Sequence, residues 1–171
     1  MGAAVLLLGL VLCACSEASG SAASDPAARQ TVDGISITVP RGWTLRRHPV
    51  PALLEPSLPF AVGSWPIPAG GNGCAPTRAI SAQPATAALF WLYEYPPAGR
   101  PSSDFPPQPK RFHLGRLGGP FECLGVRSYL ILFRSHGRDF QVHVILGRRA
   151  GRLRQAVIAA LSSLRVHAPQ P

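Results

Sequence analysis

Residues 126–146 read VRSYLILFRSHGRDFQVHVIL, and this stretch decides the fold. Two apolar segments, 126–134 and 138–146, flank Ser135-His136-Gly137, where Gly137 can take the positive φ that a tight turn requires. Apolar side chains fall on every second position: Tyr129, Ile131 and Phe133 in the first segment, and Phe140, Val142, Val144 and Leu146 in the second. A period of two is typical of strands, so this stretch predicts a β-hairpin with one face in the core.

The flanking sequence predicts more strands and two helices. Residues 34–39, GISITV, alternate in the same way, and short extended segments are expected at 43–45, 60–65 and 111–114. Residues 86–95, TAALFWLYEY, are apolar on both faces, which is typical of a central strand covered on both sides. A short helix is predicted over 76–82, begun by Pro76, and a longer amphipathic helix over 150–164.

These elements predict an α+β domain with a mostly antiparallel sheet of six or seven strands, a short helix, and a C-terminal amphipathic helix packed on the sheet. The order resembles the PsbP-like group of small α/β/α sandwiches and small actinobacterial lipoproteins of similar appearance. The resemblance is carried by ISITVPRGW at 35–43, the glycine-hinged hairpin, and LSSL at 161–164, and it covers residues 33–166. That group has no single shared activity, so the resemblance implies a fold and no functional residue.

The N-terminus predicts export and a lipid anchor. Residues 3–12, AAVLLLGLVL, are an apolar run of the length found in secretory signals and too short to span a bilayer. Leu12-Cys13-Ala14-Cys15 resembles the bacterial lipobox, which implies that Cys15 carries the lipid; an ordinary secretory signal is the alternative. We therefore expect a lipoprotein signal peptide at 1–14, a flexible tether at 15–31, and one globular domain at 32–168, held at the outer side of the cell membrane.

Two further cysteines, Cys74 and Cys123, lie 49 positions apart in the sequence. Outside the cytoplasm such a pair is usually oxidised, so we expect a structural disulfide between them. A redox motif is disfavoured because there is no Cys-x-x-Cys, and a metal site is disfavoured because no His lies near either Cys at ligand spacing.

The chain is strongly basic. It has 171 residues, with 17 Lys and Arg against 8 Asp and Glu, which gives a formal net charge of +9. The basic residues that could bind an anionic lipid or wall polymer are Arg46, Arg47, Arg148, Arg149 and Arg152. A merely solvated basic face is the alternative. Nucleic acid is not expected as a partner, because aromatic residues do not interleave the basic ones.

No familiar reactive set is present in the sequence. There is no Gly-x-Ser-x-Gly, Ser-x-x-Lys, Gly-x-Gly-x-x-Gly or His-Glu-x-x-His, and the five histidines are scattered. Glu94, at the end of the apolar 86–95 segment, is expected to pair with an arginine; a hydrolase acting through Glu94 is the less favoured alternative. The sequence thus predicts a non-catalytic binding or accessory module of the cell envelope, with no cofactor or metal, anchored to the membrane and meeting an envelope protein or an anionic polymer.

Overall fold

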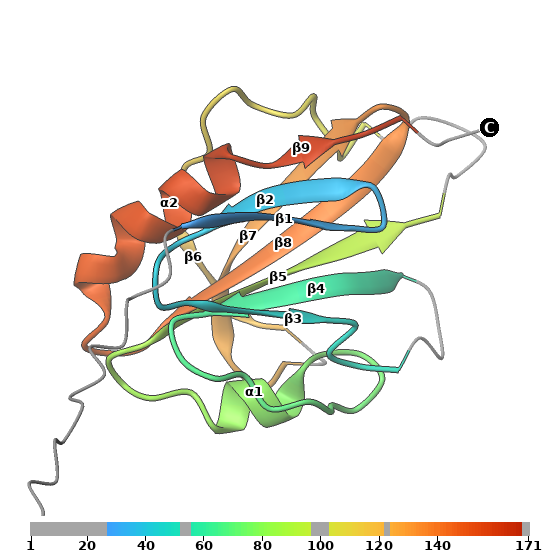
Figure 1. Ribbon diagram of the computed structural model, residues 1–171. Helices are drawn as coiled ribbons and strands as arrows, with labels where there is room; N and C mark the ends of the chain where they lie inside the picture. Colours follow the sequence, from blue (N-terminus) through green and yellow to red (C-terminus); the bar gives the residue numbers. More distant parts are fainter. Residues whose placement is uncertain (1–26, 52–55, 97–102, 122–123, 169–171) are drawn as a thin grey trace, which may run out of the picture.

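The computed structural model describes residues 27–51, 56–96, 103–121 and 124–168, which form nine strands in two antiparallel sheets (Figure 1). The larger sheet has the order β3-β4-β5-β8-β7-β6. Its strands are β3 (Thr44–Arg47), β4 (Ser57–Gly63), β5 (Ala88–Tyr95), β6 (Leu117–Pro120), β7 (Arg127–Ser135) and β8 (Arg138–Leu146). The sequence correctly places β5 at the centre, between β4 and β8.

The smaller sheet has the order β1-β2-β9 and lies over one face of the larger one, beside helix α2 (Figure 1). Its strands are β1 (Ala28–Val32), β2 (Ile35–Val39) and β9 (Arg165–Val166). Helix α2 (Arg154–Ser162) follows a 3-10 turn, η1 (Gly151–Leu153), and the short helix α1 (Thr77–Ser81) lies on the opposite face. The domain is therefore layered, with the large sheet in the middle, which confirms the predicted α+β class.

Two apolar cores result from the alternation of side chains across the large sheet. The first core, under α2 and the small sheet, includes Phe90, Phe133, Phe140 and Leu161. The second core, under α1 and its neighbouring loops, includes Leu89, Trp91, Tyr93 and Ala79. The two faces of β5 thus enter different cores, as its two-sided apolar pattern predicts.

Tight two-residue turns set the register of the β1–β2 hairpin and of the β7–β8 hairpin. His136 and Gly137 have φ values of 50° and 73°, and Asp33 and Gly34 have 48° and 73°. Two successive positive φ angles define the type I′ turn, whose twist matches that of paired strands. The β7–β8 hairpin predicted from 126–146 is confirmed, with Ser135 opposite Arg138.

Two predictions about the chain's organisation are corrected. The expected tether at 15–31 is wrong for its last four residues, because β1 begins at Ala28 and pairs with β2 along its whole length. The expected strand at 111–114 is also wrong. Its apolar residues Phe112 and Leu114 fill the first core without pairing to a strand, and the Phe112 amide donates to Ser162 Oγ at 3.0 Å.

The predicted lipid site Cys15, the signal peptide, and Cys123 lie outside the described residues. Within the described ranges, no helix has the length and apolar character needed to cross a membrane.

Candidate functional site

The five arginines predicted to bind anions fall into two groups. Arg46 and Arg47 lie on β3, an edge strand, and Arg46 Nε donates to the Ile67 carbonyl oxygen at 2.6 Å, so its head group is engaged. Arg148, Arg149 and Arg152 lie between β8 and α2, and all three are exposed. Three of the five predicted arginines therefore follow one another between β8 and α2, and the other two lie on the separate strand β3.

The loop that carries the second group runs beside the segment that leads into β5. Gly147 N donates to the Ala87 carbonyl oxygen at 2.9 Å, and Arg149 N donates to that of Ala85 at 2.8 Å. These bonds bring the start of β5 and the approach to α2 together at one end of the large sheet. Arg152 thereby reaches a pocket that the sequence did not reveal.

This pocket, the Arg–Trp pocket, encloses about 380 Å³ and is formed by four separate segments. Its distinctive side chains are Arg41 and Trp43 from the β2–β3 turn, Trp65 after β4, and Arg152 from η1. The remaining lining residues are Gly42, Ser64, Pro84, Thr86, Ala87 and Leu153. Its described lining contains two arginines and no acidic side chain, so it is an electropositive hollow with two indole walls.

Local sequence explains the position of Arg41 and Trp43. Trp43 N donates to the Pro40 carbonyl oxygen at 3.0 Å, which closes a tight turn over Pro40–Trp43. Gly42 occupies the turn with φ of 74°, a conformation that residues with a Cβ rarely adopt. The turn projects Arg41 into solvent while the half-buried Trp43 packs on the first core.

The two tryptophans belong to different layers. Trp43 packs against the first core, whereas Trp65 packs against the second. The pocket therefore opens at the end of the large sheet, where the two layers meet. Both indoles are half-buried, so each is fixed by the fold and still offers a face to a bound molecule.

The arginines of this pocket are free of internal partners. Within the described part of the chain, the side chains of Arg41 and Arg152 make no hydrogen bond or ion pair, and both residues are exposed. An unpaired guanidinium has five N–H donors in a planar fork that matches a carboxylate or a phosphate. The arrangement can therefore bind an anion that also carries a flat or apolar surface.

A second hollow, of about 480 Å³, lies at the other end of the large sheet beside the β7–β8 turn, and we call it the hairpin-end pocket. It is also basic. Arg134 forms a bidentate pair with Asp139 at 2.5 and 2.7 Å, and Arg165 Nη1 donates to the Ser162 and Leu164 carbonyl oxygens at 3.3 and 2.7 Å. The exposed Lys110 makes no hydrogen bond or ion pair within the described residues. The described lining of this pocket holds no tryptophan, so it lacks the indole walls of the Arg–Trp pocket.

A buried polar network inside the second core contains a Ser–His contact that resembles a catalytic pair. His143 Nδ1 lies 2.8 Å from Ser128 Oγ, and Gln141 Nε2 lies 2.5 Å from His143 Nε2. Tyr95 donates to Gln141 Oε1 at 2.7 Å, which directs the Gln141 amide group toward the ring. Since that amide can only donate, His143 Nε2 accepts and the ring proton is on Nδ1, pointing at Ser128.

Solvent does not reach this pair. Ser128 is 0% exposed and His143 is 2% exposed, and the His143 ring stacks on Trp91 with 5.2 Å between centroids. Burial lowers the pKa of His143 from 6.5 to about 4, so the ring is neutral at physiological pH. The network is therefore a structural element of the core. His143 lies on β8 of the predicted hairpin, and its burial is a feature that the sequence analysis did not indicate.

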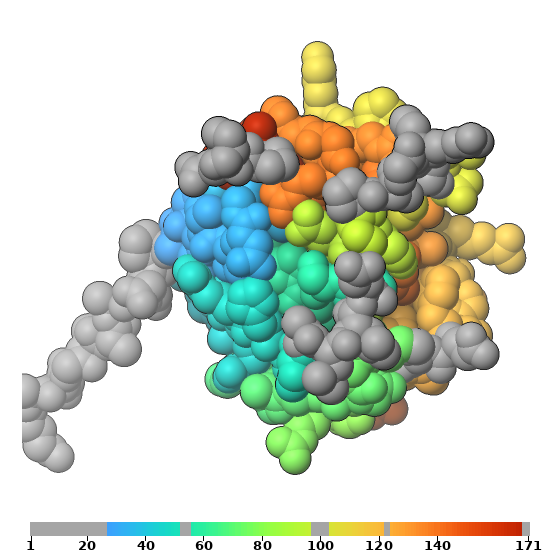
Figure 2. Space-filling model, turned by 90° about the vertical axis from the view of Figure 1, so that its right-hand side faces the viewer, coloured from blue at the N-terminus to red at the C-terminus, as the bar shows by residue number. Residues whose placement is uncertain are grey.

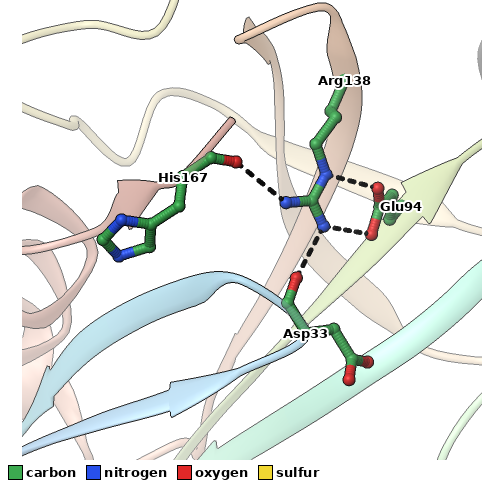
Figure 3. A network of polar contacts seen from close by, with 4 residues as sticks. All are labelled: Asp33, Glu94, Arg138 and His167. Atoms are coloured by element: carbon green, nitrogen blue, oxygen red, sulfur yellow. Dashed lines mark hydrogen bonds and ion pairs between the residues drawn. The ribbon is translucent and has the colours of Figure 1, made fainter. Parts of the chain in front are cut away.

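Glu94 pairs with an arginine, as predicted. Arg138 Nε and Nη2 donate to the two Glu94 carboxylate oxygens at 2.6 and 2.7 Å (Figure 3). The same guanidinium donates to the carbonyl oxygens of Asp33 at 2.9 Å and His167 at 3.4 Å. We call this the Arg138 clamp. It joins the β1–β2 turn, the end of β5 and the β7–β8 hairpin, which meet on the face shown in Figure 2.

The structure supports one of the two cysteines of the predicted disulfide. Cys74 is disulfide-bonded, and its carbonyl oxygen accepts a hydrogen bond from the Tyr93 hydroxyl group. Its expected partner Cys123 lies outside the described residues, but Phe121 and Leu124, on either side of it in the sequence, pack in the same core as Ala75. Among the residues that the structure places, no three His, Cys, Asp or Glu side chains gather as a metal site.

The Arg–Trp pocket therefore combines the free cationic groups, the aromatic surface and the concavity that a binding site requires. Comparison of the chain with protein-family models, with curated proteins and with solved structures found no match.

Proposed function

We propose that this protein is an extracytoplasmic lipoprotein whose folded domain binds an anionic component of the cell envelope without transforming it. The observation that carries the proposal is the Arg–Trp pocket, in which Arg41 and Arg152 are exposed and unpaired beside two half-buried indoles. The net charge of +9 adds a long-range attraction for anionic partners. The ligand is thus an anion of the envelope, and the domain is a PsbP-like sandwich used as a binding module.

The membrane anchor in this proposal rests on the sequence. Leu12-Cys13-Ala14-Cys15 supplies the lipobox pattern, and twelve residues, 16–27, separate Cys15 from the first residue of β1. Acyl chains on Cys15 would hold the domain at the membrane, because each buried CH₂ contributes about 0.8 kcal/mol and stable anchoring requires two signals.

The non-catalytic part of the proposal is supported by how the reactive side chains are used. The Ser128–His143 pair is buried beyond the reach of a substrate, and its ring proton points toward the serine. Both carboxylate oxygens of Glu94 are occupied by Arg138. Ser128, His143 and Glu94 therefore each have a structural partner within the described residues.

Fractionation of cells tests the anchor. In bacterial cells that acylate lipoproteins, the full chain should float with membranes and incorporate an alkyne-labelled fatty acid. Cys15→Ser should abolish the label, whereas the matched variant Cys13→Ser should keep it. Loss of the label in Cys13→Ser alone, or no label in the unmodified chain, would contradict the assignment of Cys15.

Titration with a soluble polymer tests binding. The anchored protein in neutral detergent micelles should bind poly(glycerol phosphate), and the binding should weaken as salt rises, because screening shortens the range of the attraction. Arg41→Ala and Arg152→Ala should each weaken it, and Arg116→Ala, an exposed arginine that does not line the pocket, should not. Equal binding to neutral dextran would refute the role of charge.

A further inference from the structure

The position at which the chain enters the fold distinguishes the two ends of the domain. In the β1–β2 pair, Ala28 lies opposite Val39, at the end of β2. The turn that carries Arg41 and Trp43 begins at the next residue, Pro40. The segment that leads back to Cys15 therefore joins the domain at the end that holds the Arg–Trp pocket, on the left in Figure 1.

The Arg138 clamp and the hairpin-end pocket lie at the opposite end of the strands. The β1–β2 turn and the β7–β8 turn are both there, on the right in Figure 1. The two basic hollows thus differ in their distance from the anchored segment: the Arg–Trp pocket is close to it and the hairpin-end pocket is far from it. An anchor on Cys15 would consequently favour contact between the membrane and the Arg–Trp pocket.

The length of the connection limits how far the pocket can move from the bilayer. Residues 15–27 number thirteen, and a fully extended chain of that length spans at most about 45 Å. Ala28, and with it the pocket end, must stay within that distance of the acylated residue. Headgroups of the same membrane are accordingly the anions present at the highest local concentration.

The chemistry of the pocket suits a phospholipid headgroup. Two guanidinium groups can bind a phosphate through paired N–H donors, and the exposed Arg148 and Arg149 follow β8 on the loop that hydrogen-bonds to the pocket wall. Trp43 and Trp65 provide half-buried indoles, the side chains most enriched where apolar and aqueous regions of a membrane meet. Among the residues that the structure describes, no carboxylate lines the pocket to repel a phosphate.

We propose that the Arg–Trp pocket binds the phosphate headgroup of an anionic phospholipid in the membrane that carries the anchor, so that the domain lies with this end on the bilayer. This inference rests on the proposed function and specifies its ligand. Arg41 and Arg152 hold the phosphate, Trp43 and Trp65 pack against the glycerol and upper acyl region, and the hairpin-end pocket faces away from the membrane.

Quenching of tryptophan fluorescence by brominated lipids tests the proposal on the whole anchored protein. The acylated chain is reconstituted into vesicles of brominated phosphatidylcholine, with or without phosphatidylglycerol. The anchor is the same in both, so any difference reports capture of the headgroup. Trp43 and Trp65 should be quenched with phosphatidylglycerol present, while Trp91, which is fully buried, supplies a background. Trp43→Phe and Trp65→Phe should each remove part of the quenching.

Matched arginine variants distinguish the pocket from general charge. Arg41→Ala and Arg152→Ala should each reduce the equilibrium constant for docking about fivefold, the effect of one basic residue near an anionic surface. Arg116→Ala, also exposed but outside the pocket, should leave docking unchanged. Urea unfolding of every variant shows whether the fold is intact. An equal loss in all three variants would overturn the assignment to the pocket.

Soluble competitors separate this inference from the proposed function. If poly(glycerol phosphate) binds in micelles but phosphatidylglycerol vesicles produce no extra quenching, the ligand is a polymer, and the lipid inference falls while the proposed function stands. If free glycerol phosphate displaces the vesicle contact at a concentration equal to that of the lipid, the site recognises a free phosphate and the lipid inference also falls. If neither polymer nor vesicle binds, both proposals are wrong.

Discussion

Acid should destabilise the domain through His143. The ring is 2% exposed, stacks on Trp91, and receives its Nε2 hydrogen bond from an amide that cannot accept a proton. A proton added to Nε2 would face the Gln141 donor inside an apolar core. The folded protein therefore resists protonation of this ring, while the unfolded chain does not.

The magnitude follows from the two pKa values. Burial lowers the pKa of His143 from 6.5 to about 4, so the unfolded state binds a proton first as pH falls. Above the unfolded value both states are neutral and the group has no effect on stability. Between about pH 7.5 and about pH 5 the unfolded state gains about 2 kcal/mol relative to the folded state, and the full difference of about 3 kcal/mol is reached near pH 4.

Urea unfolding of the disulfide-intact chain across this range measures the effect. The unmodified protein should lose about 2 kcal/mol more than His143→Gln between about pH 7.5 and about pH 5, because glutamine does not titrate. His113→Gln, which replaces an exposed histidine, should follow the unmodified protein. If His143→Gln shows the same loss as the unmodified protein, the buried neutral ring is not the cause and the reasoning fails.

Three further outcomes are expected. Arg138→Ala should lower the free energy of unfolding by roughly 2–3 kcal/mol, because it leaves Glu94 unpaired in a partly buried site, and Glu94→Gln should lower it by less. Urea unfolding measures the loss, with Arg111→Ala as an exposed control. Equal losses in Arg138→Ala and Arg111→Ala would contradict the role of the clamp. Cys74→Ser should cost about 4 kcal/mol or less, and a reductant should destabilise the unmodified chain without affecting the variant; peptide mapping that joins Cys74 to a residue other than Cys123 would disprove the predicted pairing. Gly42→Ala should lower the free energy of unfolding by roughly 1–2 kcal/mol through its φ of 74° alone, because a Cβ there meets no atom within 4 Å. It should also weaken anion binding, because a changed turn displaces Arg41 and Trp43. Unchanged binding in the titration with poly(glycerol phosphate) would show that the pocket does not depend on this turn.

The strands that bury complete alternating patterns could be predicted from sequence. The β7–β8 hairpin and β2 carry a period of two, and β5 is apolar on both faces, so the burial of one face or of both follows from the sequence. The pairing of Glu94 with an arginine was also predictable, because a carboxylate at the end of an apolar strand needs a cationic partner.

The missed elements lack such a local signal. β1 reads ARQTV, which is mostly polar and exposed, and it is a strand because the Asp33-Gly34 turn folds it back onto β2. β6 contains two glycines and a proline, and β9 has only two residues. In each case tertiary pairing outweighs propensity.

The site was missed for a related reason. Arg152 was identified as basic, but Arg41, Trp43 and Trp65 lie between 87 and 111 positions before it in the sequence, and only the sheet order brings them together with it. His143 is a polar residue on the face of β8 opposite to its alternating apolar residues. Its hydrogen-bond partner Ser128 lies on the neighbouring strand, so the burial of His143 depends on the register of the hairpin.

The placement of β1 at the border of the small sheet has a consequence for release of the protein by proteases. If Cys15 is acylated as proposed, a cut before Ala28 would free the domain from the acyl chains and would keep every strand pair of the described residues intact. A cut within the Asp33-Gly34 turn would instead allow β1 to dissociate and would expose the backbone N–H and C=O groups along β2. An unpaired edge strand can pair with a strand from another molecule. The cut before Ala28 should therefore yield a soluble product, and the cut within the turn should yield an aggregating one.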